Sequence, residues 1–233
     1  MKTRAVSPEK LDNLSLNGKE LEHALQSLEW VNRQLGNHRS VTKAINRIYQ
    51  KEKKHLEIID LGCGGGDLAA AIARSLRALK ASFSITGIDG NLNSLQYARG
   101  KYGGYPELFF EKANILDPGF RVKPCDILVS SHFIYHFTEG GLIQFLHTNM
   151  PALSTAFICS ELERSKMALS AFRHSSFLLP LSKMAKEDGQ LAIQRSFTRK
   201  EWMDILNHSG IQDYKVKKVL LFRLLITIYP NRN

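Results

Sequence analysis

Cysteine is scarce in this chain of 233 residues, which has only Cys63, Cys125 and Cys159. Three scattered cysteines are too few for a disulfide framework or a four-ligand zinc site. All three lie in or beside apolar, strand-like segments, so we expect buried, reduced thiols that pack as small apolar side chains. The histidines also lack H-E-x-x-H or any comparable spacing, and we therefore expect no metal.

Long apolar runs are also missing. Runs such as 219–222 and 224–228 are separated by Arg223, and each is far shorter than the roughly 20 residues of a membrane-spanning helix. No apolar stretch of the secretory kind follows the first four residues. We therefore expect a cytoplasmic protein. Its length, its apolar fraction of 43% and its ordinary glycine and proline content are typical of an enzyme with one substantial core.

Acidic residues are outnumbered, with 22 Asp and Glu against 32 Lys and Arg and a formal net charge of +10. Residues 56–160 carry eight basic and nine acidic residues, whereas 1–55 carry eleven and six, and 161–233 carry thirteen and seven. The excess therefore lies on the two flanking segments. An RNA partner, peripheral contact with an anionic membrane, or an ordinary solvated surface would each explain it. Nucleic acid is disfavoured because basic and aromatic residues do not alternate in a base-stacking pattern.

The most informative segment is 58–67, where an apolar run meets a glycine turn containing Gly62, Gly64 and Gly66. An alanine- and leucine-rich stretch with helical spacing follows it. Glycine permits positive φ and a close approach of backbone to a ligand, and the start of a helix offers free N–H groups. The pattern predicts a nucleotide-binding corner, with a plain structural turn as the alternative.

The spacing distinguishes between two classes of cofactor. A dinucleotide fingerprint G-x-G-x-x-G that begins at Gly62 needs its third glycine at position 67, where Asp67 stands. A carboxylate there would face a pyrophosphate, so we expect a ligand without phosphate. We also expect Asp67 to cap the following helix. The D-x-G-x-G-x-G pattern from Asp60 to Gly66 resembles the first motif of the class I S-adenosylmethionine-dependent methyltransferases.

Three later segments strengthen this resemblance. The alternating stretch 83–88 ends in Asp89, whose carboxylate can accept both hydroxyls of a ribose. Asn114 matches a loop residue that faces adenine in the family, although many members have aspartate there. The strand-like run 125–130 is followed by 131–137, which resembles the fourth motif of small-molecule methyltransferases. The resemblance implies S-adenosylmethionine as cofactor, bound by Asp60, Gly62, Cys63, Gly64, Gly66, Asp89, Gly90, Asn114, Ile115 and Ser130.

The resemblance covers about residues 56–160 and implies an α/β fold. This fold is Rossmann-like and doubly wound, with a mostly parallel seven-stranded sheet and helices on both faces. Such sheets bind ligands at the carboxyl ends of their strands, so the residues above should meet at one edge. We expect residues 56–233 to form the methyltransferase domain and 1–55 to form an N-terminal helical cap. Apolar residues at helical intervals within 19–50 indicate two amphipathic helices, which either pack on the sheet or line an acceptor pocket.

The segment 161–196 is too long for a simple connection, and its apolar residues predict an inserted helical lid. Such a lid suits a lipophilic or aromatic acceptor. Glu161-Leu162-Glu163-Arg164, Asp188-Gly189 and the run 195–201 resemble features of bacterial methyltransferases that act on quinones, phenols or polyketide-derived lipids. A small-molecule acceptor is therefore favoured. An RNA methyltransferase and a donor-binding protein without catalysis remain alternatives.

The reaction expected is in-line attack of an acceptor oxygen or carbon on the methyl group of the sulfonium. Good alignment of the reactants can supply about 7–11 kcal/mol. A phenolic acceptor would also need a base, and imidazole titrates near working pH. His132 and His136 follow the fourth strand, and His174 lies in the lid. Each of the three is a candidate base, with a structural role as the alternative.

Overall fold

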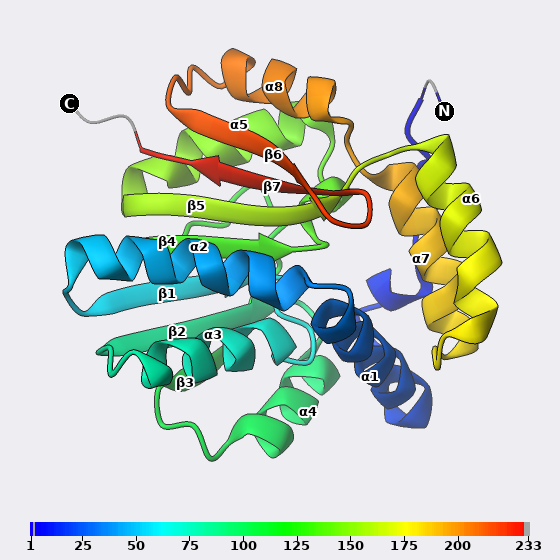
Figure 1. Cartoon of the computed structure of the whole chain (residues 1–233), viewed down its shortest axis with the longest axis horizontal. Helices are drawn as coiled ribbons and strands as arrows, with labels where there is room; N and C mark the ends of the chain where they lie inside the picture. Colours follow the sequence, from blue (N-terminus) through cyan, green and yellow to red (C-terminus); the bar gives the residue numbers. More distant parts are fainter. Residues whose placement is uncertain (2, 231–233) are drawn as a thin grey trace.

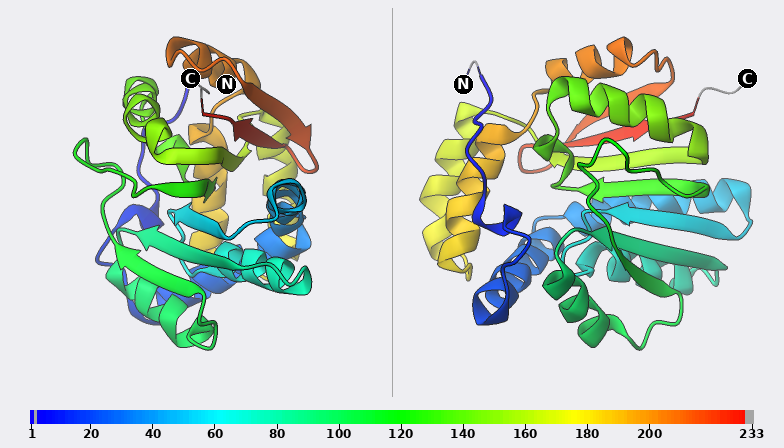
Figure 2. Two further views of the ribbon diagram at one scale, coloured as in Figure 1. Left: turned by 90° about the vertical axis from the view of Figure 1, so that its left-hand side faces the viewer. Right: turned by 180° about the vertical axis from the view of Figure 1, so that it is seen from behind.

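One seven-stranded sheet runs through the centre of the computed structural model, which describes residue 1 and residues 3–230, and helices cover both of its faces (Figures 1 and 2). The strands are β1 (Leu56–Leu61), β2 (Phe83–Asp89), β3 (Leu108–Lys112), β4 (Cys125–Ser131), β5 (Leu153–Leu162), β6 (Tyr214–Val219) and β7 (Arg223–Ile228). The helices are α1 (Gly18–Gln34), α2 (Asn37–Glu52), α3 (Asp67–Ala78), α4 (Leu92–Tyr102), α5 (Glu139–Asn149), α6 (Lys166–Ser175), α7 (Lys183–Arg195) and α8 (Arg199–His208).

The strand order is β3-β2-β1-β4-β5-β7-β6. The first five strands along this order pair in parallel, and β7 is antiparallel to both β5 and β6. The mostly parallel, Rossmann-like sheet is thus confirmed, with a mixed edge. A turn of three residues joins β6 to β7, and so short a connection permits only antiparallel pairing.

Strand β1 shows how the sheet builds two cores. Its residues alternate between the faces, so Ile58 packs with α2 and α3 while Ile59 joins the core on the other face. Val41 of α2 and Ile72 of α3 are fully buried in the first core, and Trp202 of α8 is fully buried in the second. Parallel strands that are covered on both faces have near-continuous apolar sequences, and this explains why most residues of 56–61 are apolar.

Two helices, α1 and α2, cover the segment 19–50, as the periodicity predicted, but they pack in different places. Helix α2 packs on the sheet beside α3, whereas α1 lies at the carboxyl ends of the strands, near α7 (Figure 1). Glu29 of α1 accepts a hydrogen bond from the Tyr102 hydroxyl of α4 at 3.1 Å, and Ser27 accepts one from the Ser182 N–H at the start of α7 at 2.9 Å. Because α2 packs in the core of the sheet, the structure does not separate residues 1–55 as a cap of their own. The domain boundary at residue 55 stays a prediction.

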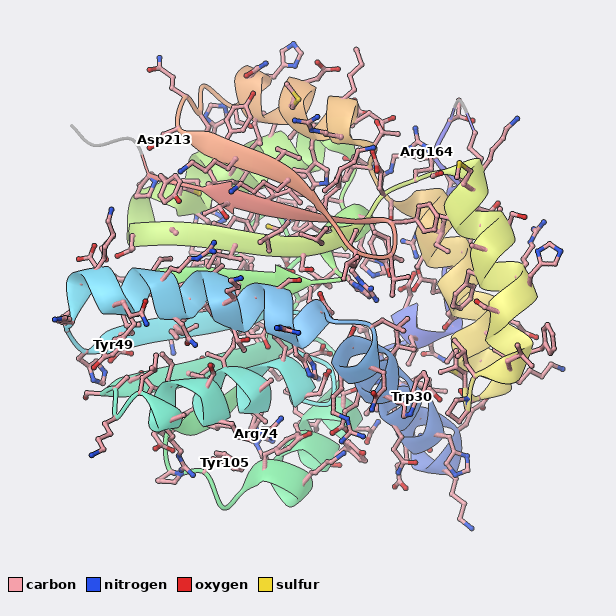
Figure 3. All side chains as sticks on the ribbon, in the orientation of Figure 1. Trp30, Tyr49, Arg74, Tyr105, Arg164 and Asp213 are labelled. Atoms are coloured by element: carbon pink, nitrogen blue, oxygen red, sulfur yellow. The ribbon has the colours of Figure 1, made fainter. Side chains whose placement is uncertain are left out.

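The segment 161–196 contains α6, a short 3₁₀ turn (Ser176–Leu178) and α7, which together we call the lid. Figure 3 places Arg164 where the lid begins, and its buried guanidinium donates to the Ser196 carbonyl at 3.1 Å, close to where the lid ends. The two helices pack closely, since a Cβ on Gly189 would lie 2.6 Å from Phe172. No helix in the described part of the chain is long and apolar enough to cross a membrane.

Candidate functional site

A cavity of about 520 Å³ lies at the carboxyl ends of the strands, between the sheet and the helices α1, α6 and α7. Polar and glycine residues from the loops after β1, β2 and β3 form one part of its wall, and mainly apolar side chains from α1 and the lid form another. The residues of the first part are Gly62, Gly64, Asp89 at the end of β2, Gly90, Asn91, Asn114 and Ile115. The apolar residues include Leu25, Leu28, Val31, Leu35, Phe172, Leu181 and Ile193.

The glycine corner requires its glycines. Gly62, Gly64 and Gly66 have φ of +67°, +51° and +77°, values that other residues adopt at a cost. A Cβ on Gly62 would also lie 2.4 Å from the ring of Phe133. Gly62 and Gly64 line the cavity, and Gly66 occupies the position before α3. The corner therefore exposes bare backbone to any ligand held there.

Asp89 is held against this corner by two backbone N–H groups. Its Oδ2 accepts from Gly64 at 2.9 Å, and its Oδ1 accepts from Asn91 at 2.8 Å. Burial raises the pKa of Asp89, while these backbone bonds oppose the shift. Asn114 reaches the cavity from the loop after β3, where its side-chain oxygen accepts from the Leu116 N–H at 3.1 Å.

Four of the residues assigned to the cofactor do not line the cavity: Asp60, Cys63, Ser130 and Gly66, the last of which precedes α3. Ser130 donates to the Leu61 carbonyl at 3.1 Å and so ties β4 to β1, and Cys63 is buried against Gly87. Asp60 is buried, and its Oδ2 has no hydrogen-bond partner in the described part of the chain. Burial, and then the charges of Asp67 and Asp89, raise its pKa well above the ordinary value.

The prediction that Asp67 caps α3 is wrong. Gly66 holds the cap position, and Asp67 is the first residue of the helix. Its Oδ2 accepts instead from His38 at 2.7 Å and from Asn32 at 3.0 Å. Burial alone would raise the pKa of Asp67, but these bonds hold it below its ordinary value. Asp67 thus ties the glycine corner to α1 and α2, which local sequence could not reveal.

The structure brings two of the three candidate histidines to the cavity. His132 accepts a hydrogen bond from Arg223 Nε at 3.3 Å, and burial lowers its pKa to about 3. His136 presents Nδ1 3.3 Å from Asp12 Oδ1, and burial lowers its pKa to about 4. His174 is exposed on α6 and is not part of the cavity wall.

Residues 4–16, here called the N-terminal strap, run along the lid and across to the loop after β2 (Figure 2). The strap is fastened along its length. Asp188 of α7 accepts from the N–H groups of Lys10 and Leu11 at 3.0 Å each, and Asn91 donates from its side chain to the Leu16 carbonyl at 3.1 Å. The strap therefore connects the lid to the glycine corner's side of the cavity.

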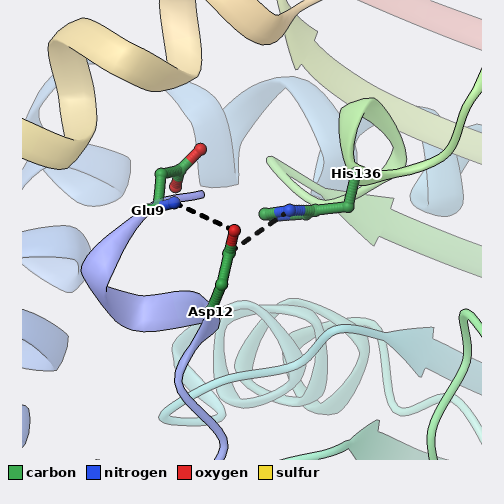
Figure 4. A group of neighbouring side chains, drawn as sticks. All are labelled: Glu9, Asp12 and His136. Atoms are coloured by element: carbon green, nitrogen blue, oxygen red, sulfur yellow. Dashed lines mark hydrogen bonds and ion pairs between the residues drawn. The ribbon is translucent and has the colours of Figure 1, made fainter. Parts of the chain in front are cut away.

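The strap brings two carboxylates into the cavity wall, beside Tyr135, His136 and Arg195. Figure 4 shows Asp12 between Glu9 and His136, where its carboxylate accepts from the Glu9 N–H and lies beside the imidazole. Arg195 Nη1 lies 2.7 Å from Asp12 Oδ2 and 3.1 Å from Glu9 Oε1, and the Tyr135 hydroxyl is 3.1 Å from Glu9 Oε2. Burial raises the pKa of Glu9 to about 8, against the opposing charge of Arg195. We call these five residues the polar cluster.

The ligand atoms of Glu9, Asp12 and His136 lie within 4.8 Å of one another, which is close enough to hold a metal ion. Arg195 already lies against both carboxylates, and its fixed positive charge opposes a second cation there. We therefore keep the absence of a metal as a prediction.

Sequence reasoning missed Glu9, Asp12 and Arg195 as site residues. The local signal for the two carboxylates was the Glu9-x-x-Asp12 spacing, which forms a capping box at the 3₁₀ turn Lys10–Asp12. That signal predicts a helix start and says nothing of a distant cavity.

A family model described as a methyltransferase domain matches residues 52–213, well over half of the chain. Solved methyltransferases share the fold at low identity. The plantazolicin methyltransferase BpumL, solved with S-adenosylhomocysteine (SAH), is 18% identical, with a TM-score of 0.68 over 91% of this chain and 96% of its own. Magnesium protoporphyrin IX methyltransferase from Synechocystis PCC 6803, also with SAH bound, is 14% identical, with a TM-score of 0.57 over 84% of each chain.

The carbon methyltransferase CurJ is 14% identical, with a TM-score of 0.63 over 84% of this chain. The match spans only 54% of CurJ, so this chain corresponds to about half of that protein. No curated protein matches the sequence. The family match, together with the glycine corner and Asp89 at the carboxyl edge of the sheet, places the chain among the class I S-adenosylmethionine-dependent methyltransferases.

Proposed function

We propose that the enzyme methylates an oxygen or carbon of a small acceptor with a lipophilic or aromatic body. One observation carries this proposal: a single cavity is bordered by the glycine corner and Asp89 as well as by the apolar side chains of α1 and the lid. A methyl donor at the corner would therefore share one enclosed space with an apolar acceptor. Pockets of this kind bind small ligands through apolar walls and a few placed polar groups.

The residues at the corner fit the donor. Each oxygen of Asp89 accepts one backbone N–H, so lone pairs remain for ribose hydroxyls. The partnerless Oδ2 of Asp60 is a buried acceptor next to the glycine turn, suited to a cationic group. We assign direct contacts to Gly62, Gly64, Asp89, Gly90, Asn114 and Ile115, and a supporting role to Asp60, Cys63, Gly66 and Ser130.

The donor supplies an electrophilic methyl group, which the acceptor attacks in line as the carbon–sulfur bond breaks. The chain itself aligns the reactants, and its apolar walls exclude water. His136 is the better candidate base, because burial keeps it neutral and Asp12 lies beside Nδ1, which leaves Nε2 to take the acceptor proton. His132 is less suited, since its Nε2 already accepts from Arg223.

Glu9 and Tyr135 complete the polar side of the acceptor site. With a pKa raised to about 8, Glu9 is largely protonated at neutral pH. Both groups can then donate as well as accept a hydrogen bond, which suits a hydroxyl or carbonyl oxygen on the acceptor. Arg195 holds Glu9 and Asp12 in place from the end of α7.

The test is to incubate the full chain and a cell extract with a donor that carries a deuterated methyl group, and to follow the label by mass spectrometry. We expect label in lipid-soluble small molecules. The Asp89→Ala variant, which should not hold the donor, is the control. Label in RNA would support an RNA methyltransferase, and donor binding without any transfer would support a non-catalytic protein.

A further inference from the structure

The outer surface of the lid exposes large apolar side chains. Met167, Phe177 and Leu178 are 71%, 68% and 74% exposed, and Leu220 in the turn between β6 and β7 is 81% exposed. Exposed apolar side chains that gather in one region mark an interaction surface more often than scattered ones do. We call these four residues, with the lysines and arginine described next, the outer lid face.

The charge of the same region is mainly positive. Residues 163–187 contain five Lys and Arg and two acids, Glu163 and Glu187, one at each end. Of these five, Lys166, Arg173 and Lys183 are exposed. A surface that mixes apolar and basic side chains matches an anionic bilayer, which accepts apolar groups beneath a layer of phosphates.

Helix α6 separates this face from the cavity. Ala168 is buried, and Phe172, one turn further on, packs against Gly189 of α7. Lys166 stands on the opposite side of the helix, which forms an outer edge of the molecule (Figure 1). Arg173 is exposed at the edge toward α7, where its Nε donates to Gln190 Oε1 at 2.9 Å. The lid therefore has an inner side toward α7 and the cavity, and an outer side in solvent.

The exposed apolar residues are immediate neighbours of residues in the cavity wall. Met167 precedes Ala168, and Leu220 precedes Leu221; Ala168 and Leu221 both line the cavity. Phe177 follows Ser175, another lining residue, by two positions. A surface that touches the outer lid face would thus lie next to the walls of the acceptor site.

We propose that the outer lid face docks on an anionic lipid bilayer, and that the acceptor passes from the bilayer into the cavity. The choice of acceptor source rests on the proposed function, whereas docking itself requires neither donor nor acceptor. A bilayer is chosen as the partner because five Lys and Arg outnumber two acids in residues 163–187, and four bulky apolar side chains are exposed on two separate segments.

The test is co-sedimentation of the full chain with vesicles of phosphatidylcholine alone and of phosphatidylcholine mixed with phosphatidylglycerol. We expect stronger binding to the anionic vesicles, weakened by added salt. The paired change Phe177→Asp and Leu178→Asp should lower the bound fraction about tenfold on both kinds of vesicle. The paired change Lys166→Glu and Lys183→Glu should remove the preference for anionic vesicles.

Matched controls come from the rest of the surface. Phe109→Asp on β3, where the side chain is 53% exposed, and Lys51→Glu at the end of α2 change the same residue types outside the lid. Wild-type binding by the lid variants, or no binding of the wild type to either vesicle, would overturn the proposal. A dimer in sedimentation velocity that the Phe177 and Leu178 changes dissolve would assign the face to a second copy instead, and so would also overturn it.

Calorimetry with SAH separates this proposal from the proposed function. If the wild-type chain binds SAH but no vesicle, the docking proposal fails and the proposed function stands. A chain that binds vesicles but not SAH rejects the donor site and leaves the docking standing.

Discussion

Arg195 Nη1 lies 2.7 Å from Asp12 Oδ2, and this ion pair joins the end of α7 to the N-terminal strap. The strap lies outside residues 52–213, which match the methyltransferase family, yet it supplies two of the five residues of the polar cluster. The polar cluster thus joins a segment outside the family match to Tyr135, His136 and Arg195 inside it, whereas the glycine corner and Asp89 belong to the sheet and its loops.

Replacing Arg195 by methionine should destabilise the protein. Glu9 and Asp12 would lose their shared cation, and the Glu9 side chain is only 6% exposed. Because Glu9 is largely protonated at neutral pH, Asp12 is the carboxylate left without its cation, and a hydrogen bond to a charged group is worth about 1.5–3 kcal/mol. Urea denaturation should show a loss near this range. Lys200→Met, which breaks the exposed pair with Asp204, should cost less than about 1 kcal/mol, and an equal loss in both variants would contradict the prediction.

Glu9 should make stability depend on pH. Burial raises its pKa from 4.5 to about 8, so the folded protein holds this proton more tightly than the unfolded chain. Its contribution is therefore complete below about pH 4.5 and is lost as the pH rises through about 8. Because Glu9→Gln mimics the protonated side chain, the free energy of unfolding of the wild type should fall relative to this variant, by on the order of 1 kcal/mol per pH unit.

Urea denaturation of both proteins at several pH values across that interval measures the difference. His136 titrates in both proteins, and its lowered pKa contributes stability that is lost as the pH falls, so the comparison must be made between proteins at each pH. Parallel curves for the two proteins would show that Glu9 is ionised throughout and would refute the prediction.

The glycine corner should govern donor binding. Asp89→Ala removes the acceptor for the Gly64 N–H and the carboxylate proposed for the ribose, and a hydrogen bond to a charged group is worth about 1.5–3 kcal/mol. We expect SAH to bind about 10- to 100-fold more weakly by calorimetry. Gly62→Ala should also weaken binding, since its Cβ would clash with Phe133. Gly140→Ala, with open space around it, is the control and should leave the affinity unchanged.

The glycine corner and the position of Asp89 were predictable because their signals are local. The positive φ values of Gly62 and Gly64 follow from their place between a buried strand and a helix, and Asp89 follows from its place at the end of β2. Parallel pairing then brings such ends together at one edge. The sequence predicted the outer strands β6 and β7 less clearly, although the apolar run 224–228 falls within β7.

Contacts that join distant segments were not predictable. Asp67 stands where a helix cap is expected, but His38 and Asn32 bind its carboxylate once α1 and α2 have packed. Glu9 and Asp12 carry no motif that points to α7. His174 shows the converse error: it lies two residues after the inward-facing Phe172, so helix geometry turns it away from the cavity.

His136 should act as the base for an oxygen acceptor. With Nδ1 beside Asp12, the imidazole can take a proton on Nε2, and positioned acid–base groups contribute about 10²–10⁴-fold to rate. His136→Gln should therefore lower kcat by about 100-fold or more while the affinity for SAH is unchanged.

Asp12 acts as a positioning residue, and its charge raises the pKa of His136. Asp12→Asn should lower kcat and also move the acid limb of the kcat profile to lower pH, a shift that a merely structural change would not produce. Wild-type turnover in His136→Gln would show that the proton leaves by another route, and an unmoved acid limb in Asp12→Asn would show that Asp12 does not act on this imidazole.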